Sequence, residues 1–170
     1  MKLLLIDDEF ACMESIKQIL KPAGYQCVLF KNPCEALEAF KNDHFDLVIT
    51  DFRMPEMNGI EVLKEIRKLD PNTRVIIMTG FAEIDNAIAA VNNGAYAFFR
   101  KPVDVKDFME TVSKIEEELK NNEEKEVNLN QLADEYKKLR QASESIKNII
   151  DQLTPINHQL TPINQGVIIK

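Results

Sequence analysis

The stretch Leu47-Val-Ile-Thr-Asp51-Phe-Arg53-Met-Pro55-Glu-Met-Asn58-Gly59 is the most informative part of this sequence for the fold. It begins with four apolar or β-branched residues that run directly into an aspartate, and a loop punctuated by Pro55 and Gly59 follows. A short, continuously apolar strand is typical of a parallel sheet with helices on both faces. Asp51 then lies at the carboxyl edge of the sheet, where open α/β folds bind ligands. On this stretch alone, Asp51 is either a helix-capping turn residue or a functional group.

Strand and helix patterns alternate five times along residues 1–120. Apolar runs predict strands at 2–6, 26–30, 47–50, 74–78 and 96–99, and a helical pattern follows each run. This alternation is typical of a doubly wound, five-stranded parallel sheet. The right-handed crossovers of such a sheet place helices on both of its faces. We therefore predict an α/β fold with strand order 2-1-3-4-5.

Polar residues follow four of the predicted strands: Asp7 and Asp8, Asp51, Thr79, and Lys101. In the order 2-1-3-4-5 the first and third strands are neighbours, so the three carboxylates converge. Clustered acids repel one another unless a proton or a cation lies among them, and hard oxygen ligands suit Mg²⁺. Taken singly, the aspartates could cap a helix, the threonine could begin a turn, and the lysine could be a solvated charge. Their common position at one sheet edge favours a site for Mg²⁺ and a tetrahedral anion.

Composition excludes several classes of protein. The chain has 170 residues, of which 45% are hydrophobic, and a formal net charge of −7, which disfavours general binding to nucleic acid or an anionic membrane. Its three cysteines are odd in number and lack metal-ligand spacing, which indicates reduced thiols in a cytoplasmic protein. No signal peptide and no apolar run long enough to cross a bilayer is recognised, so no membrane insertion is expected.

Four sequence segments resemble the receiver domain of two-component response regulators, over about residues 1–120. They are Leu5-Ile-Asp7-Asp8-Glu9, Thr50-Asp51-Phe-Arg53-Met54-Pro55-Glu-Met-Asn58-Gly59, Met78-Thr79-Gly80 and Gly94-Ala-Tyr96-Ala-Phe98-Phe99-Arg-Lys101-Pro102. The combination is specific, whereas an Asp-Asp pair alone is weak. The residues around Asp51, Thr79 and Phe98 are most similar to receivers of the nitrogen-regulator-like subfamily.

The resemblance implies that Asp51 is the phosphoacceptor, which attacks the phosphorus of a phosphohistidine or a small phosphodonor to give an acyl phosphate. It also implies that Mg²⁺ is held by Asp7, Asp8, Asp51 and the backbone carbonyl of Arg53. The bound cation would neutralise charge that develops on the transferring phosphoryl group. Such a domain is not an enzyme on other substrates and catalyses only its own phosphorylation and dephosphorylation.

The remaining family positions are implied in the same way. Lys101 would pair with one phosphoryl oxygen, and the hydroxyl of Thr79 would donate a hydrogen bond to another. Phe98 occupies the aromatic switch position, where the family often has tyrosine, so it can repack but has no hydroxyl to donate. The Lys101–Pro102 peptide bond is expected to be cis.

Phosphorylation adds negative charge and strong acceptor oxygens, which can bias a two-state surface. The resemblance places that surface on about Ala82 to Leu119. The helix 10–20 is expected beside the acidic pocket, where it would dock a histidine kinase or a phosphotransfer protein through Phe10 and Met13. The alternative for these apolar residues is that they belong to the core.

Residues 121–127 are polar and are either a linker or a helical continuation, and residues 128–153 carry an apolar heptad pattern. One helix cannot bury this stripe alone, so it either pairs with another helix or folds back on the receiver. We favour a homodimeric coiled coil. The pattern is interrupted by Ser143, and its apolar positions are Leu129, Leu132, Tyr136, Leu139, Ile146, Ile150 and Leu153.

Residues 154–170 form a proline-containing tail in which Leu153-Thr-Pro-Ile-Asn157 recurs as Leu160-Thr-Pro-Ile-Asn164. Prolines at this spacing are expected to exclude a regular helix. His158-Gln-Leu-Thr-Pro-Ile faintly resembles the phosphoacceptor box of histidine kinases, but an ordinary histidine is the simpler interpretation. No phosphate-binding Gly-rich loop or basic helix-turn-helix pattern is present, so no ATPase domain and no direct nucleic-acid binding are expected.

Three hypotheses follow. The first is a phosphorylation-activated response regulator in a two-component phosphorelay, which acts through protein–protein interaction and a helical dimerisation tail. The second is an enzyme on the same carboxylate–Mg²⁺–lysine layout, such as an aspartyl-phosphate phosphatase, although no cap domain that would enclose a substrate is recognised. The third is a truncated transcriptional regulator that lacks its output domain.

Overall fold

A computed structural model of the protein describes residues 1–80 and 84–160, except for the side chains of 84–87 and 154–160. Residue contacts divide the chain into two units, Met1–Lys120 and Asn121–Lys170. Each unit is therefore described by itself. Ala82, the first residue of the predicted switch surface, lies outside the described residues.

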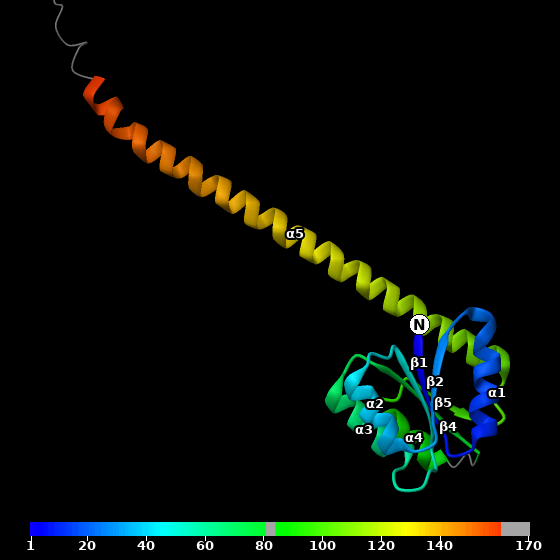
Figure 1. The fold of residues 1–170 in the computed structure, drawn as a ribbon. Helices are drawn as coiled ribbons and strands as arrows, with labels where there is room; N and C mark the ends of the chain where they lie inside the picture. Colours follow the sequence, from blue (N-terminus) through cyan, green and yellow to red (C-terminus); the bar gives the residue numbers. More distant parts are fainter. Residues whose placement is uncertain (81–83, 161–170) are drawn as a thin grey trace, which may run out of the picture. The chain divides into compact units, whose positions relative to one another are not determined.

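The first unit is built on one parallel sheet (Figure 1). Strand order is β2-β1-β3-β4-β5, and every neighbouring pair is parallel, so the predicted fold class is confirmed. Its strands are β1 (Lys2–Ile6), β2 (Gln26–Phe30), β3 (Leu47–Asp51), β4 (Arg74–Thr79) and β5 (Ala97–Arg100). The helices are α1 (Phe10–Leu20), α2 (Pro33–Asn42), α3 (Gly59–Leu69), α4 (Ile84–Asn92) and α5 (Val105–Leu160), with a 3-10 turn at Lys21–Ala23.

Two apolar layers cover the two faces of the sheet. Helices α2, α3 and α4 pack on one face, where Phe40, Leu63 and Ala90 are buried among strand residues. Helix α1 and the first turns of α5 pack on the other face through residues such as Leu20 and Phe108. Strand β3 is buried along its whole length because helices cover both of its faces. This explains why its sequence is continuously apolar before Asp51.

Helix α3 begins at a capping box that fixes the loop after β3. The side-chain oxygen of Asn58 accepts hydrogen bonds from the backbone N–H groups of Ile60 at 2.9 Å and Glu61 at 3.0 Å. The carboxylate of Glu61 accepts in return from the backbone N–H of Asn58 at 2.8 Å. These bonds satisfy donors that the first helical turn would otherwise leave without partners.

We expect Asn58→Ala to lower the free energy of unfolding by about 1 kcal/mol, because Ala cannot accept these bonds. Urea denaturation of the full chain measures the change. Asn72→Ala is the control, because the hydrogen bonds of Asn72 to Asp70 and Arg74 use backbone groups of Asn72. Equal losses in the two variants would contradict the capping role.

Helix α5 includes the predicted helical continuation and corrects the prediction for the proline-containing tail. It runs from Val105 to Leu160, so residues 121–127 are helical and the proline-containing segment begins inside the helix. The prediction that Pro155 excludes a regular helix is wrong. Proline removes one intrahelical hydrogen bond, but its φ of about −65° is helical. The side chain of His158 and the second proline of the repeat, Pro162, lie outside the described part of the chain.

No helix within residues 1–80 and 84–160 is long and apolar enough to span a lipid bilayer. The three cysteines, Cys12, Cys27 and Cys34, are free thiols.

Candidate functional site

The predicted site residues meet at the carboxyl edge of the sheet because their strands are neighbours there. Asp7 directly follows β1, Asp51 ends β3, Thr79 ends β4, and Lys101 directly follows β5. Strand register places Asp51 opposite Met78 and Thr79 opposite Arg100. A cavity of about 380 Å³ opens at this edge. It is lined by Asp7, Asp8, Glu9, Cys12, Asp51, Arg53, Thr79, Gly80, Lys101 and Pro102.

Lys101 connects two buried carboxylates at the base of this cavity. Its Nζ donates to Oδ2 of Asp7 at 2.6 Å and forms an ion pair with Oδ1 of Asp51. The Asp7 side chain is 2% exposed, and that of Asp51 is 9% exposed. The Lys101–Pro102 peptide bond is cis, as the resemblance implied. One ammonium group is therefore shared by two acids that are far apart in the sequence.

Backbone N–H groups hold the second oxygen of each carboxylate. Oδ1 of Asp7 accepts from the N–H of Glu9 at 2.9 Å, and Oδ2 of Asp51 accepts from the N–H of Arg53 at 2.6 Å. Hydrogen bonds on both oxygens fix the orientation of each carboxyl group. Asp51 thus presents its carboxylate to the cavity from a rigid strand end.

Burial and charge raise the pKa values of two groups at the site, Asp7 and Lys101. Desolvation raises the pKa of Asp7 above its ordinary value, and the hydrogen bond from Lys101 offsets only part of that effect. Burial by itself would lower the pKa of Lys101, but its hydrogen bonds to Asp51 and Asp7 raise it above the ordinary value. Lys101 is therefore held as a cation at neutral pH.

The carboxylate oxygens of Asp7, Asp8 and Asp51 suit Mg²⁺, although they are not arranged as a closed metal centre. Among the described residues, no three His, Cys, Asp or Glu side chains are placed so that they could hold a metal ion together. Asp8 is exposed, whereas Asp7 and Asp51 are buried and share Lys101. The chemistry of the set fits, because carboxylate oxygens are preferred ligands of Mg²⁺. Coordination by both buried aspartates requires the ammonium group to move away from at least one of them.

Phe98, the predicted aromatic switch residue, is partly buried against one of the two apolar layers. Its ring contacts Phe52 edge to face, with centroids 6.4 Å apart and an interplanar angle of 74°. Both rings pack against the apolar layer that contains α3. Phe52 directly follows Asp51, so a movement of Phe98 would change the packing of the residue next to Asp51.

Gly59 is a site residue whose role was missed in the sequence. A Cβ atom at this position would lie 2.5 Å from the backbone oxygen of Asp51 and 3.1 Å from the Cα of Phe52. The glycine thus allows α3 to begin directly against the strand end that carries Asp51. Its place eight residues after Asp51 was visible, but the close approach depends on the path of the loop.

We expect Gly59→Ala to cost about 1–3 kcal/mol of unfolding free energy, because backbone atoms must shift to admit the methyl group. The reaction of Asp51 with a phosphodonor should slow as well. Thermal denaturation and a phosphorylation time course measure the two effects. Gly80→Ala is the control for the stability measurement, since no atom of the described residues lies within 4 Å of a Cβ there. Unchanged stability of Gly59→Ala would contradict this steric argument.

Helix α1 borders the cavity. Of its two residues predicted to dock a partner, Phe10 is exposed and Met13 is buried. Phe10 is 51% exposed, with Nζ of Lys31 5.4 Å from its ring centroid, so it remains available for docking. Met13 is 2% exposed and packs in the core, so its predicted docking role is wrong. Met13, Ile16 and Leu20 share the buried stripe of the helix at spacings of three and four, which is the face turned to the sheet.

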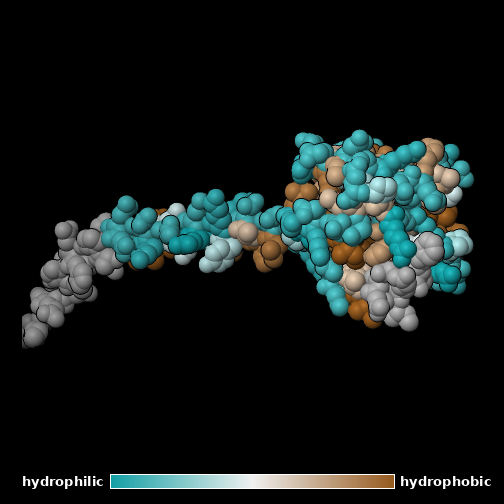
Figure 2. All heavy atoms as spheres, turned by 90° about the horizontal axis from the view of Figure 1, so that it is seen from below, coloured by the Kyte–Doolittle hydropathy of each residue, from teal (hydrophilic) through white to brown (hydrophobic). Residues whose placement is uncertain are grey.

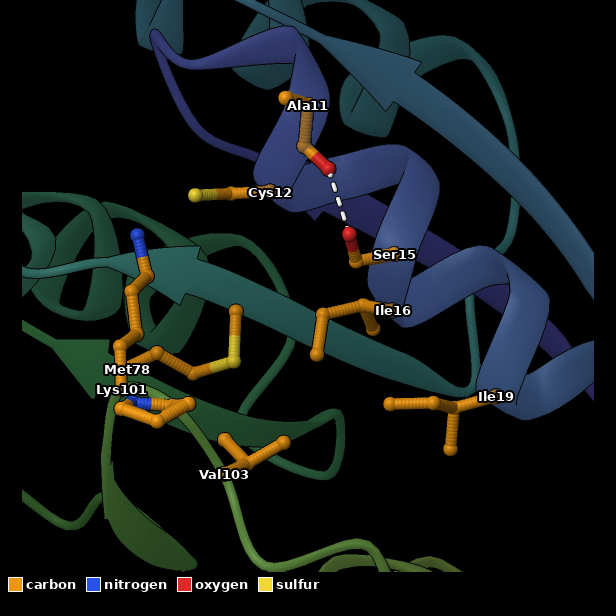
Figure 3. Close-up of a pocket in the computed structure, with 9 residues that line it drawn as sticks. Ala11, Cys12, Ser15, Ile16, Ile19, Met78, Lys101 and Val103 are labelled. Carbon is orange, nitrogen blue, oxygen red and sulfur yellow. Dashed lines mark hydrogen bonds between the residues drawn. The ribbon is translucent and has the colours of Figure 1, made fainter.

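A second, mainly apolar pocket of about 360 Å³ lies between α1 and the segment after β5 (Figure 3). Side chains of Cys12, Ile16 and Ile19 point from the helix toward Met78, Lys101 and Val103 (Figure 3). Cys12 also lines the acidic cavity, and its thiol contacts Oε2 of Glu9 at 3.2 Å. Burial and this contact raise the pKa of Cys12 to about 11, so the thiol is protonated at neutral pH.

Comparison with known proteins agrees with this geometry. A family model described as the response regulator receiver domain matches residues 3–113. Sporulation initiation phosphotransferase F of Bacillus subtilis (strain 168) is 34% identical over 113 residues, which are 66% of this chain and 91% of that protein. Transcriptional regulatory protein ZraR of Klebsiella oxytoca is 38% identical over 111 residues, 65% of this chain. The match spans only 25% of the length of ZraR.

Solved structures show the same similarity. A response regulator receiver domain protein from Clostridium thermocellum superposes with a TM-score of 0.66 at 36% identity, covering 70% of this chain and 96% of that one. The beryllofluoride-activated NtrC4 receiver domain dimer superposes with a TM-score of 0.66 at 32% identity, covering 69% and 97%.

Proposed function

The chain belongs to the response regulator receiver family, and from that premise we propose that it is a phosphorylation-activated regulator in a two-component phosphorelay. Asp51 accepts the phosphoryl group from a histidine kinase or a phosphotransfer protein. The observation that carries the proposal is the ammonium group of Lys101 between the buried carboxylates of Asp7 and Asp51. This arrangement provides a nucleophile and a mobile counter-charge at one sheet edge.

In the proposed reaction, a carboxylate oxygen of Asp51 attacks the phosphorus of a phosphohistidine. An O–P bond forms as the N–P bond breaks, and the imidazole leaves with the electron pair and takes up a proton. Lys101 pairs with a phosphoryl oxygen, on which negative charge develops during the transfer. The Thr79 hydroxyl donates a hydrogen bond to another phosphoryl oxygen. The chain in this proposal is not an enzyme on other substrates, since the phosphoryl group ends on its own side chain.

The proposed cofactor is Mg²⁺, held by Asp7, Asp8, Asp51 and the backbone carbonyl of Arg53. When bound, it neutralises the acids and the oxygens of the phosphoryl group. The donor set supports this proposal, since hard oxygens line the cavity from two neighbouring strand ends. Bound there, the cation would balance the carboxylates, which would allow Lys101 to pair with the phosphoryl group.

The proposed switch begins at Thr79, which moves toward the phosphoryl oxygens, and continues through Phe98. The edge-to-face contact with Phe52 supports this proposal, because it links Phe98 to the residue next to Asp51. The responding surface is the face from about Ala82 to Leu119. In the described part of that face, Ile88 and Val91 of α4 and Val105 of α5 are exposed, which suits a surface that exchanges partners.

The proposed docking face for the phosphodonor is the exposed side of α1 with Phe10. The apolar pocket beside Lys101 supports this, because it shares Cys12, Lys101 and Pro102 with the cavity that contains Asp51. Output is proposed to occur through protein–protein contacts and a homodimer formed by the tail, in the cytoplasm and without direct nucleic-acid binding.

The test is phosphorylation with acetyl phosphate, followed by intact-mass measurement of the full chain. We expect one stoichiometric, Mg²⁺-dependent phosphate that the Asp51→Asn variant does not acquire. Asp134→Asn, an exposed aspartate of α5, is the matched control and should be labelled normally. Label in the Asp51→Asn variant, or steady hydrolysis of a phosphate ester by wild-type protein, would contradict the proposal.

A further inference from the structure

The tail carries one narrow apolar stripe, which we call the seam. Its positions alternate at steps of three and four, which is the spacing of heptad positions a and d. The a positions are Leu129, Tyr136, Ser143 and Ile150, and the d positions are Leu132, Leu139, Ile146 and Leu153. The apolar members are 57–70% exposed in the single chain. So much exposed apolar surface on one helix face indicates that another element covers it.

Outside the seam and its flanks, the helix is polar. The b, c and f positions are all exposed and hydrophilic: Asn130, Gln131, Asp134, Lys137, Lys138, Gln141, Glu144, Ser145, Asn148, Asp151 and Gln152. On the face seen in Figure 2 the tail is mainly hydrophilic, with hydrophobic side chains visible in patches. The flanking e and g positions hold Glu135, Arg140 and Lys147 as well as Ala133, Ala142 and Ile149. The apolar stripe is therefore centred on a and d, as in the seam of a coiled coil, whereas a helix in a larger bundle carries a broader apolar face.

Charges beside the seam distinguish the two orientations that a pair of identical helices can adopt. Glu135 is a g position, and Arg140 is the e position five residues later. In a parallel, in-register pair these positions face each other, so Glu135 of each copy meets Arg140 of the other. In the antiparallel register that pairs Leu129 with Leu153, Arg140 faces its own copy and Glu135 faces Ile149. Charge complementarity therefore favours the parallel pair.

Ser143, the polar residue at an a position, also favours the parallel pair. Ser143 faces Ser143 in a parallel, in-register pair, so the two hydroxyl groups lie together in one layer. In the antiparallel register, Ser143 faces Leu139 and the hydroxyl is left against an apolar neighbour. A polar residue at a single a position is known to set register at a cost in stability. Leucine at three of the four d positions is typical of two-stranded parallel coils.

From these observations we infer that two copies of this chain associate through a parallel, in-register, two-stranded coiled coil along residues 129–153. Its orientation is set by two symmetry-related Glu135–Arg140 pairs and by the Ser143 layer. This inference rests on the homodimer of the proposed function. It adds the orientation and the register of the two helices. The consequence is that corresponding residues of the two tails lie at the same level along the coil.

A charge-reversal cycle in the full chain tests the orientation. Glu135→Lys and Arg140→Glu should each weaken dimerisation about tenfold, measured by sedimentation equilibrium, because each turns two attractions into repulsions. The double variant should recover most of the affinity. Arg140 also lies 3.8 Å from Glu144 in its own helix, so helical content is followed by circular dichroism. Lys138→Glu at a c position is the control and should leave dimerisation unchanged.

Cross-linking supplies an independent measurement. Leu132→Cys should form a disulfide-linked dimer under mild oxidation, because position 132 faces itself in the parallel pair. In the antiparallel register the two cysteines would lie about 27 Å apart. Lys138→Cys and wild-type protein, which retains its native thiols, set the background. Failure of Leu132→Cys to cross-link above that background overturns the inference, as does a double variant no tighter than Arg140→Glu.

The outcomes separate this inference from the proposed function. A dimer that neither cross-links at 132 nor recovers in the double variant overturns the orientation and leaves the dimerising tail standing. A monomeric full chain, before and after phosphorylation, overturns both the inferred coil and the dimerising tail. Labelling of Asp51 is measured on the same samples and tests the phosphoacceptor separately. Full labelling together with a monomer would leave the receiver function intact.

Discussion

Replacement of Lys101 by methionine is expected to remove about 3 kcal/mol of unfolding free energy when no divalent cation is present. The loss arises because Asp7 and Asp51, both buried, would lose the ammonium group they share. Methionine keeps the apolar stem, so packing changes little. Phosphorylation of Asp51 should slow at least ~100-fold, since one stabilising charge is missing from the transition state.

Added Mg²⁺ provides a sharper readout of the same variant. In wild-type protein the metal must displace the ammonium group from the carboxylates, whereas in Lys101→Met it meets uncompensated acids. The thermal midpoint should therefore rise more in the variant than in wild type when Mg²⁺ is added. Lys106→Met is the control, because Lys106 is an exposed lysine paired with Glu110 at 3.8 Å. A variant as stable as wild type without metal would refute the role of Lys101.

The pH dependence of this variant has a definite sign. Removal of Lys101 takes away a hydrogen bond that lowers the pKa of Asp7, so that pKa rises further above its ordinary value of 3.8. The native state then binds the proton more tightly than the unfolded state, and stability falls as pH rises from 3.8 through the native pKa. Lys101→Met should thus be closest to wild type at low pH. In wild type, the contribution of Lys101 is present below its ordinary pKa of 10.5 and is lost as pH rises through the raised native pKa.

Phe108→Ala should cost about 3–5 kcal/mol of unfolding free energy. Phe108 is fully buried, and its ring meets Phe99 of β5 edge to face with centroids 5.4 Å apart. Truncation leaves a cavity in the layer that holds α1 and the first turns of α5 on the sheet. Neighbouring side chains are close-packed and can fill only part of it.

Val105→Ala tests whether the loss of stability in Phe108→Ala is specific to a buried side chain. Val105 begins the same helix but is 52% exposed, so its truncation should change stability by less than ~0.5 kcal/mol. Guanidinium denaturation of both variants gives the comparison. Similar losses for Phe108→Ala and Val105→Ala would show that helix propensity, rather than burial, controls this segment.

Local sequence patterns predicted most of the fold because the underlying interactions are local. Apolar runs marked the five strands, and Asn58 with Glu61 marked the start of α3 through contacts three residues apart. The heptad spacing in the tail likewise follows from helical geometry alone. Pro155 is the exception, since the helix continues through it to Leu160. An interior proline costs a helix about 3 kcal/mol through a lost hydrogen bond and a ring clash, but it can kink a helix without ending it.

The sequence alone determined which residues end the strands, and hence that Asp7, Asp51, Thr79 and Lys101 lie at one edge. Only the tertiary structure decided that Lys101 joins Asp7 to Asp51 across 94 and 50 positions of the chain. It also decided that Met13 turns inward, and that α3 begins so close to Asp51 that only glycine fits at position 59. These outcomes depend on distances between segments that are remote in sequence. Residue type and spacing fix the periodicity of each segment, but only packing of all the segments fixes which side chains touch.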